Sequence, residues 1–412
     1  MLFRSLNGLG SLNITFDTPT AESFLFSFEM LLVNDERRPD LPARLIPVPY
    51  DWKKRAPDIR FMDAERERVK ANGTVPSMAD RHTIFNLDAT PEAKLGTGAV
   101  AVEQLPPGSY MILARAPGRL EVRIPFSMPR NGKVERRIDL PRSDDAPPLF
   151  FYMAGGDFIA GGTTAGAPAP HVRRVPPSLI YHDEITMGEY AEFLQALTKS
   201  GHAAEVRQRL PKDFGKVLAS LSRDGQLVPT GGVASESFSK SPVRGVSYND
   251  AMAYIAWRSQ QDGLPYRLPK DWEWEAACRG ADGRTYSWGN QPGKGLAAVT
   301  QGYGDTGNNM SWRWEDHKDE SPWGIHNLAG GAAEWTMSKF DPKAKPEDPV
   351  YGQLAIRGNA WALPPVGLEC AFRTSGQPDY FHPTIGFRMA LDYPVKRGLV
   401  TEATSAVPAH KH

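Results

Sequence analysis

The sequence predicts an α+β protein in which a small antiparallel β-sandwich precedes a larger, loop-rich domain with few helices. Three observations predict it. Alternating strand patterns fill residues 1–142, a Pro-rich break follows at 143–148, and the remainder combines a few helical patterns with many glycines and tryptophans. A domain built mostly of loops needs large, rigid side chains to bury enough area, and tryptophan supplies them. We assign a linker to 143–148, the second domain to 149–393 and a flexible tail to 394–412.

The N-terminal domain is predicted from apolar residues that alternate with polar ones, which is the period of a half-buried strand. The alternation occurs in three stretches, 12–16, 24–28 and 120–126. Pro/Gly turns separate the strands, as is typical of a sandwich. The charged stretch 63–70 interrupts the pattern, and we interpret it as a solvated helical insertion.

Three helices are predicted in the second domain. The first opens with a capping-box pattern at 186–189 and carries apolar residues at helical spacing through Leu197. The second begins at 247–250 and ends at Gly263. The third spans 269–278, with a proline near its first turn.

Charge and cysteine counts exclude several classes of protein. Lys and Arg total 48, as do Asp and Glu, so nothing in the net charge favours nucleic acid or an anionic membrane as partner. The longest apolar runs, 24–33 and 149–162, are shorter than the roughly 18 residues of a membrane span. No leader pattern is visible at the start. We therefore predict a soluble cytoplasmic protein with no membrane span and reduced thiols, in which Cys278 and Cys370 are buried as free, small hydrophobic side chains.

Several motifs of the second domain occur together in one known family. They include Glu184-Ile-Thr-Met-Gly-Glu-Tyr190, Tyr266-Arg-Leu-Pro-Lys-Asp-Trp-Glu-Trp274, Asn327-Leu-Ala-Gly-Gly-Ala-Ala-Glu-Trp335 and Ile385-Gly-Phe-Arg388. In their order and spacing, this part of the chain resembles the formylglycine-generating-enzyme-like (sulfatase-modifying factor) domain. The resemblance implies a variant of the C-type lectin fold over about 245 residues.

The N-terminal domain resembles, more distantly, the small β domain that precedes such domains in some bacterial Ser/Thr kinases. The residues concerned are 10–16, 106–110 and 115–118. The chain contains no H-R-D motif of a kinase catalytic loop. The resemblance therefore implies the sensor-like half of such a protein without its catalytic half.

Enzymes of the resembled family oxidise a substrate cysteine with copper held by two closely spaced cysteines, since thiolates are the ligands that Cu(I) prefers. The equivalent positions here are Leu363 and Leu368, or Ala360 and Pro365 when counted from the other side. Neither pair supplies a thiol, so no copper is expected. A related group uses iron held by histidines in an extra helical domain, and the histidines of this chain are not clustered in that way. We expect neither iron nor catalysis.

The resemblance implies one metal site, a calcium ion wrapped by the N-x-x-G-N-x-x-E-W loop. The pattern maps onto Asn327, Gly330, Ala332 and Glu334, whose side-chain and backbone oxygens are ligands that Ca²⁺ prefers. The sequence departs from the family at Gly331, where Asn is usual. The alternative is that Glu334 accepts backbone N–H bonds without a metal.

Two other charged stretches have simpler interpretations. His182-Asp183-Glu184 is interpreted as the end of a strand leading into the first helix, although it could also be a metal or acid/base cluster. Residues 315–320 are interpreted as a solvated loop.

Ligand binding is predicted in the stretch between 361 and 384, because the resembled lectin-type folds bind ligands with this surface. Residues 362–368 and 380–384 are apolar or aromatic, uncharged and interrupted by proline. The predicted ligand-binding residues are Trp361, Leu363, Pro364, Val366, Gly367, Tyr380, Phe381, His382 and Thr384. The alternative is that they seal the core of their own domain.

The same stretch resembles the variable region of proteins diversified by retroelements. The leading prediction is thus a non-catalytic protein that binds a protein or small-molecule ligand, and retroelement diversification of this surface is a further possibility. The alternatives are a copper-dependent oxidoreductase with displaced ligands and a signalling adaptor for a kinase or protease.

Overall fold

The structure is a computed structural model that describes residues 9–33, 44–51, 56–57, 94–164, 166–232, 235–290, 319–360 and 367–395. The predicted insertion at 63–70 and the tail beyond 395 lie outside the described residues, as does the stretch 361–366.

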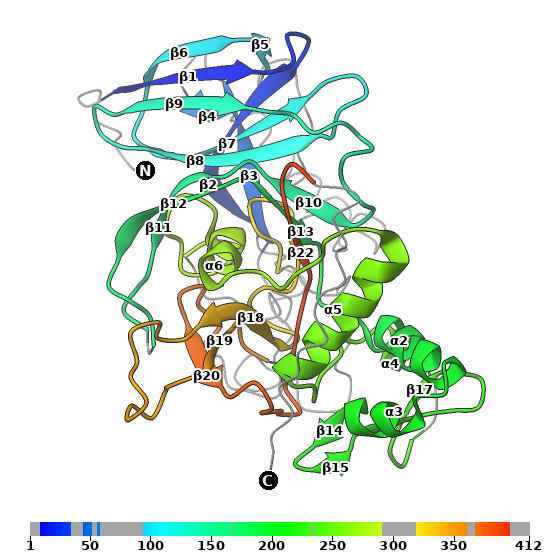
Figure 1. Cartoon of the computed structure of the whole chain (residues 1–412). Coiled ribbons are helices and arrows are strands. Elements are labelled where there is room, and N and C mark those ends of the chain that lie inside the picture. The colour runs from blue at the N-terminus through cyan, green and yellow to red at the C-terminus, as the bar shows by residue number, and fades with distance from the viewer. Residues whose placement is uncertain are drawn as a thin grey trace.

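The N-terminal part consists of strands arranged in two sheets (Figure 1). Its strands are β1 (Gly10–Phe16), β2 (Glu22–Val33), β3 (Arg44–Asp51), β4 (Ala56–Pro57), β5 (Lys94–Thr97), β6 (Val100–Leu105), β7 (Gly108–Arg115), β8 (Val122–Met128) and β9 (Lys133–Ile138). One sheet has the order β6-β1-β9. The other has the order β4-β3-β2-β7-β8, with β5 also paired to β2.

The residues at the apolar positions of the alternating pattern form the core of this part. Leu12, Ile14 and Phe16 are buried and share one hydrophobic cluster with Ile124 and Phe126 from the second sheet. The two sheets therefore pack together through these residues. One expectation was wrong: the part is not wholly antiparallel, because β1 pairs in parallel with β9.

The second part mixes short strands with the predicted helices. The first strands are β10 (Phe150–Met153), β11 (Gly156–Ala160), β12 (His171–Val175) and β13 (Ser178–Tyr181). The helices are α2 (Met187–Lys199), α3 (Ala203–Arg209), α4 (Glu236–Ser239), α5 (Tyr248–Asp262) and α6 (Asp271–Arg279). Two hairpins, β14 (Lys212–Asp213) with β15 (Lys216–Val217) and β16 (Ala219–Leu221) with β17 (Leu227–Pro229), separate α3 from α4. The last strands are β18 (Ala333–Lys339), β19 (Leu354–Arg357), β20 (Arg373–Gly376), β21 (Ile385–Gly386) and β22 (Ala390–Asp392).

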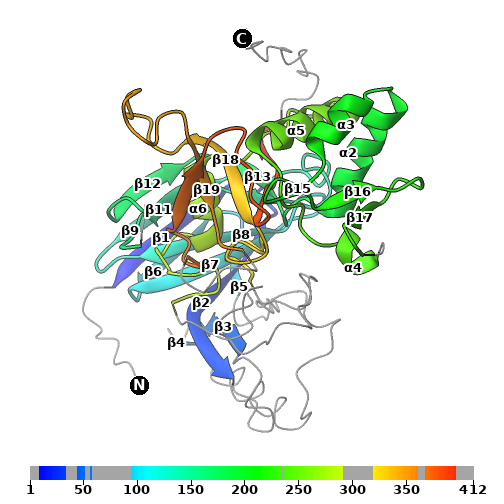
Figure 2. The ribbon, with the colours of Figure 1, turned by 90° about the horizontal axis from the view of Figure 1, so that it is seen from below.

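Local sequence explains where the long helices begin. Thr186 caps α2 and exchanges hydrogen bonds with Glu189, and Ser247 and Asp250 do the same for α5. Both capping boxes confirm the predicted helix starts. Figure 2 shows α2, α3 and α5 grouped on one side of the sheet β20-β19-β18-β21.

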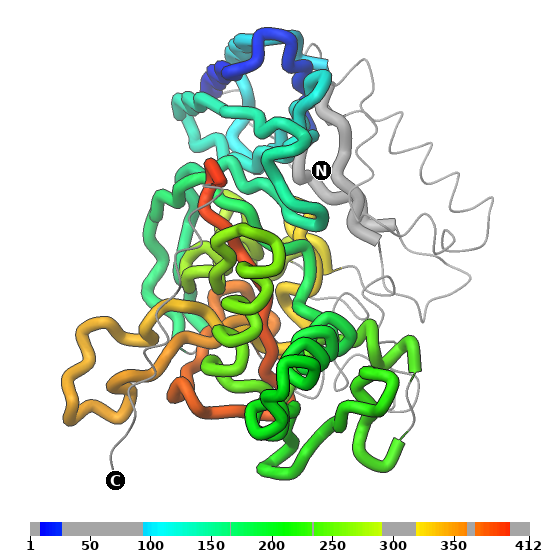
Figure 3. The backbone as a smooth tube through the Cα atoms, turned by 45° about the vertical axis from the view of Figure 1, so that its right-hand side comes forward, coloured from blue at the N-terminus to red at the C-terminus, as the bar shows by residue number. Residues whose placement is uncertain are grey.

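The two parts are packed against each other (Figure 3). The Arg123 guanidinium on β8 lies 2.5 Å from the Glu320 carboxylate of the second part. Asp319 and Glu320 are both buried, so the expectation that 315–320 is a solvated loop was wrong for these two residues. Among the described residues, no helix is long and apolar enough to cross a membrane.

Candidate functional site

A group of aromatic side chains includes one from the turn of the hairpin β14–β15, which lies at the end of the molecule opposite the N-terminal strands (Figure 1). It consists of Phe214, Tyr380, Phe381 and His382, and we call it the aromatic patch. Phe214 is 78% exposed and Tyr380 is 44% exposed. Large apolar side chains exposed together are typical of binding surfaces.

Ring contacts join the two segments of the aromatic patch. The Phe214 and His382 rings meet edge to face at 5.2 Å between centroids. The Lys212 ammonium lies 5.0 Å from the centroid of the Phe381 ring, a cation–π contact. The Tyr380 and His382 rings are stacked at 6.5 Å. A hairpin and a loop that are far apart in sequence thus present one aromatic surface.

Backbone hydrogen bonds hold the loop that carries Tyr380. The Tyr380 N–H donates to the Gln377 carbonyl at 2.9 Å, and the Ile385 N–H donates to the His382 carbonyl at 3.0 Å. Burial lowers the pKa of His382, which favours the neutral imidazole, and the nearby Asp213 opposes this shift. The aromatic patch is therefore a positioned surface with Lys212 and Asp213 at its edge.

Gly245 allows the hairpin to approach the loop. Its N–H donates to the Ile385 carbonyl and its carbonyl accepts from the Lys212 N–H, so it links both segments of the aromatic patch. It has a φ of +74°, and a Cβ there would collide with the Lys212 carbonyl oxygen. Only glycine fits this position without displacing the hairpin.

We expect Gly245→Ala to lower the free energy of unfolding by about 3 kcal/mol. Alanine would have to adopt the left-handed backbone conformation, and its Cβ would collide with the Lys212 carbonyl oxygen. Gly215→Ala, at the tip of the same hairpin, is the matched control. Gly215 has a φ of +85° but open space around it, so only the conformational cost of about 1 kcal/mol applies. Chemical denaturation measures both. Equal losses would contradict the close approach.

The structure brings together only some of the predicted ligand-binding residues. Tyr380, Phe381 and His382 belong to the aromatic patch. Thr384 is buried, with its hydroxyl oxygen 2.7 Å from Nδ1 of His382, so it positions the imidazole. Gly367 is buried against the Phe372 ring. The remaining predicted residues, Trp361, Leu363, Pro364 and Val366, lie outside the described residues.

Sequence reasoning missed Phe214. It is absent from the motifs of the second domain, and its hairpin strands are only two residues long. The turn sequence Lys212-Asp-Phe-Gly-Lys216 could have indicated it. Its glycine predicts a turn, and charged residues on both sides of the apolar residue indicate that the turn is exposed.

The predicted calcium loop is held in this structure by an ion pair. The Glu334 carboxylate accepts two bonds of 2.7 Å from Arg388 and one of 2.9 Å from Nε1 of Trp274, and all three side chains are buried. Burial raises the pKa of Glu334, and the charge of Arg388 opposes that shift. Arg388 also donates to the carbonyls of His326 and Asn327, so it ties β18 to the preceding loop.

A second carboxylate lies inside the same loop. Glu184 Oε1 accepts from the Ala332 N–H at 2.9 Å, and a Cβ on Gly331 would collide with this oxygen. Gly331, with a φ of +78°, thus makes room for Glu184 where the resembled family has Asn. Burial, together with the neighbouring Asp183, raises the pKa of Glu184. The stretch 182–184 does lead into α2, and it also supplies this buried contact.

This arrangement does not fit a calcium ion well. Of the four predicted ligands, Glu334 is the only anionic one, and both of its oxygens are engaged by Arg388, which already compensates its charge. The Asn327 side chain donates to Asp183 at 2.9 Å. Calcium binding stays a prediction, and no step of the account below depends on it.

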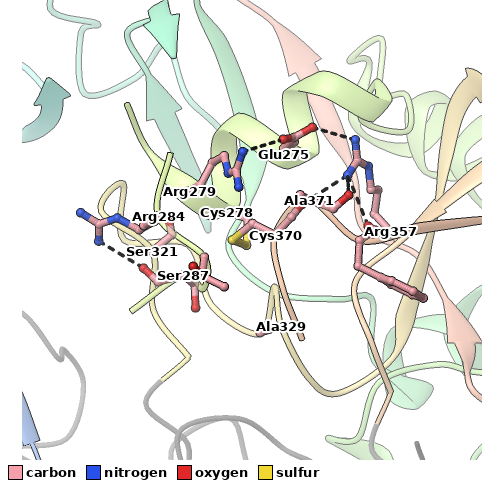
Figure 4. Close-up of a disulfide and its surroundings, with 12 residues drawn as sticks. Glu275, Cys278, Arg279, Arg284, Ser287, Ser321, Ala329, Arg357, Cys370 and Ala371 are labelled. Atoms are coloured by element: carbon pink, nitrogen blue, oxygen red, sulfur yellow. Dashed lines mark hydrogen bonds and ion pairs between the residues drawn. A yellow bond between two sulfur atoms is a disulfide. The ribbon is translucent and has the colours of Figure 1, made fainter. Parts of the chain in front are cut away.

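The two cysteines are joined in a buried disulfide (Figure 4). Cys278 on α6 and Cys370 in the turn before β20 are 92 residues apart in sequence, and their Cα atoms are separated by 5.6 Å. Both are fully buried. The expectation of free, reduced thiols was wrong. The packing of α6 against this turn brings the two cysteines together, and nothing in the sequence around either one indicates the pairing. Cytoplasmic location, which rested partly on reduced thiols, stays a prediction.

Buried ion pairs surround the disulfide, as Figure 4 shows. Glu275 binds Arg279 at 3.0 Å and Arg357 at 2.9 Å. Arg357 also donates to the backbone carbonyls of Ala371 and its neighbours, at 3.1 to 3.3 Å. The turn that carries Cys370 is therefore fixed by the disulfide and by the Arg357 guanidinium.

These residues do not fit a thiolate-held copper ion. The chain has two cysteines in all, and the disulfide engages both sulfur atoms. The position of Ala360 offers a methyl group in the buried core, and Leu368 is likewise buried. We derive no copper-dependent step.

Comparison with known proteins identifies the family. Residues 140–393 match the family model of the sulfatase-modifying factor enzyme 1-like domain, so the chain belongs to this family. It is 30% identical to mouse inactive C-alpha-formylglycine-generating enzyme 2 over 297 residues, covering 62% of this chain and 88% of that protein. It is 26% identical to the formylglycine-generating enzyme of Streptomyces coelicolor over 301 residues, covering 61% and 91%.

Other matches are partial. The chain is 30% identical to mouse formylglycine-generating enzyme over 174 residues, which is 38% of this chain and 45% of that protein, so it spans less than half of that relative. Among solved structures, Treponema denticola variable protein 1 superimposes with a TM-score of 0.42 at 19% identity, covering 58% of this chain and 94% of that one. The family thus includes members described as enzymes and members described as inactive.

Proposed function

We propose that this protein is a non-catalytic binding protein whose aromatic patch contacts a protein or small-molecule ligand. The single observation that carries the proposal is the exposure of Phe214 and Tyr380 on backbone fixed by Gly245 and the 377–385 hydrogen bonds. Exposed aromatic side chains give large contact area at a low cost in conformational entropy. A β-sandwich preceding a C-type lectin-like domain is the fold that we propose for the whole chain.

The engagement of both cysteines supports the non-catalytic part of the proposal. Mouse inactive C-alpha-formylglycine-generating enzyme 2, described as inactive, is one of the relatives that the chain matches over most of its length. The alternative, a copper-dependent oxidoreductase, requires Cys278 or Cys370 as a free thiolate. Copper titration followed by EPR, with thiol-dependent oxygen uptake, separates the two. Stoichiometric copper bound by either sulfur would overturn the binding proposal.

Photo-crosslinking tests the aromatic patch directly. We expect a benzophenone amino acid placed at Phe214 to give one discrete adduct with a protein of the native host. An excess of unlabelled wild-type chain should prevent formation of this adduct by competing for the same partner. Phe214→Ala combined with Tyr380→Ala should compete about 10-fold less well, since a few central aromatic residues dominate binding energy. Both residues are exposed, so the melting temperature of this variant should remain close to that of the wild type.

The matched control carries the same photo-reactive residue at Val172, which is 72% exposed on β12, away from the aromatic patch. Equal adduct formation from position 172, or undiminished competition by the double variant, would contradict a role of the patch in binding.

The diversified-surface hypothesis concerns residues 362–368 and 380–384, and three residues of the second stretch form part of the aromatic patch. It predicts a near-repeat of the 3′ end of the gene and a reverse transcriptase beside it. Sequencing of the locus decides this point, and absence of both elements would remove the hypothesis without affecting the binding proposal.

A further inference from the structure

A cavity of about 610 Å³ lies where the 143–150 segment crosses the second part of the chain. Its walls come from that segment, from the end of β13, and from α2 and α5. It is separate from the aromatic patch, with which it shares no residue. Cavities of roughly 300–1,000 Å³ are of the size that holds a small molecule.

Four aromatic side chains form the apolar wall of the cavity: Phe150, Tyr181, Tyr254 and Tyr266. The Phe150 ring stacks on Tyr266 at 5.5 Å between centroids and contacts the Tyr181 ring at 5.2 Å. All four side chains are largely buried in the protein. The Phe150, Tyr181 and Tyr266 rings are packed on one another and Tyr254 packs on Phe193 and Phe387, so the four rings are fixed before any ligand arrives.

Carboxylates outnumber cations around this wall. Asp144, Glu189 and Asp262 line the cavity together with a single guanidinium, Arg258. Arg258 Nε donates to Asp262 at 2.8 Å, so its charge is compensated by that carboxylate. Arg142, which does not line the cavity, lies 3.4 Å from Asp144, so the formal charge left among these groups is that of Glu189, which disfavours an anionic ligand.

Tyrosine hydroxyls orient two of these carboxylates. Tyr181 donates to Glu189 at 2.6 Å, and Tyr266 donates to Asp262 at 3.0 Å. Burial and the Glu189 carboxylate raise the pKa of Tyr181, so this phenol keeps its proton and remains a donor. Glu189 also accepts from the Thr186 N–H in the capping box of α2, which fixes it further.

We propose that this cavity binds a small organic cation, an ammonium group attached to an apolar body. Aromatic rings attract a cation through their negative faces, and they do so most strongly where water is excluded. The carboxylates complement the charge, and the apolar wall accommodates the body. A neutral ligand of the same shape would gain only the apolar contact. This inference does not depend on the function proposed for the aromatic patch.

Calorimetric titration of the full chain tests the proposal with matched probes. Choline and benzyltrimethylammonium are the cations, and 3,3-dimethylbutan-1-ol is the neutral isostere of choline. We expect saturable binding of at least one cation and binding of the isostere at least about 10-fold weaker. Failure of both cations to bind, or equal binding of choline and its isostere, would overturn the proposal.

Two variants locate the site. Asp262→Asn should weaken cation binding about 10-fold through loss of one carboxylate. Glu192→Gln is the matched control, because Glu192 also pairs with Arg258, at 3.8 Å, but does not line the cavity. Ser143→Trp adds a large side chain to the cavity lining at an exposed position and should abolish binding without unfolding the chain. Unchanged binding in both Asp262→Asn and Ser143→Trp would show that the cation binds elsewhere.

Discussion

Replacement of Arg388 by methionine is expected to lower the free energy of unfolding by about 3–5 kcal/mol, because it leaves the Glu334 carboxylate buried and uncompensated. Glu334 would keep only the bond from Trp274, and the carbonyls of His326 and Asn327 would each lose a donor. For a domain of this size, each kcal/mol lowers the melting temperature by about 2–4 °C. Calorimetry of the purified variant measures the loss.

The control for Arg388→Met is Arg174→Met. Arg174 pairs with Asp157 at 3.5 Å, but both side chains are solvent-exposed, so the expected change is about 0–1 kcal/mol. Combining Arg388→Met with Glu334→Gln should be less destabilising than Arg388→Met alone, since the charge of Glu334 is then no longer buried without its partner. If Arg388→Met lowers the free energy of unfolding by less than about 1 kcal/mol, the stabilising role of the Arg388–Glu334 pair is refuted.

Removal of the disulfide is the second change with a large expected effect. Changing Cys278 and Cys370 to alanine opens a loop of 92 residues, and loop-closure entropy alone then predicts a loss of about 4–5 kcal/mol. The alanines leave only small defects where the sulfur atoms lay. Urea denaturation, monitored by tryptophan fluorescence, measures the loss.

Reductant provides the internal control for the disulfide. It should lower the unfolding midpoint of the wild type toward that of the double alanine variant, and it should leave the variant itself unchanged. A wild-type midpoint that is insensitive to reductant, together with a variant as stable as the wild type, would contradict a structural disulfide.

The parts of the fold that could be predicted from sequence are those that local chemistry determines. The caps at Thr186 and Ser247 and the alternation in β1 depend on residues within a few positions of one another. The family motifs likewise indicate the second domain from the sequence alone. The starts of the helices, the buried faces of the strands and the family could therefore be predicted from the sequence.

The site was accessible only in part, because it depends on contacts between distant residues. Arg388 and Glu334 were each recognisable within a motif, but nothing in either motif indicates that one compensates the other. Cys278 and Cys370 are 92 residues apart in the sequence, and their pairing follows from the packing of α6. The hairpin with Phe214 falls between motifs, so the aromatic patch could be predicted only on the side of Tyr380.

Free-thiol counting tests the central claim most directly, namely that this chain uses its cysteines for structure and has none for copper chemistry. Cells of the native host should be lysed directly into guanidinium chloride that contains an alkylating reagent, so that buried thiols are exposed to it, and the modified cysteines of the purified protein should be counted by mass spectrometry. The account predicts that neither Cys278 nor Cys370 is alkylated until a reductant is added. Alkylation of both cysteines before reduction would contradict it.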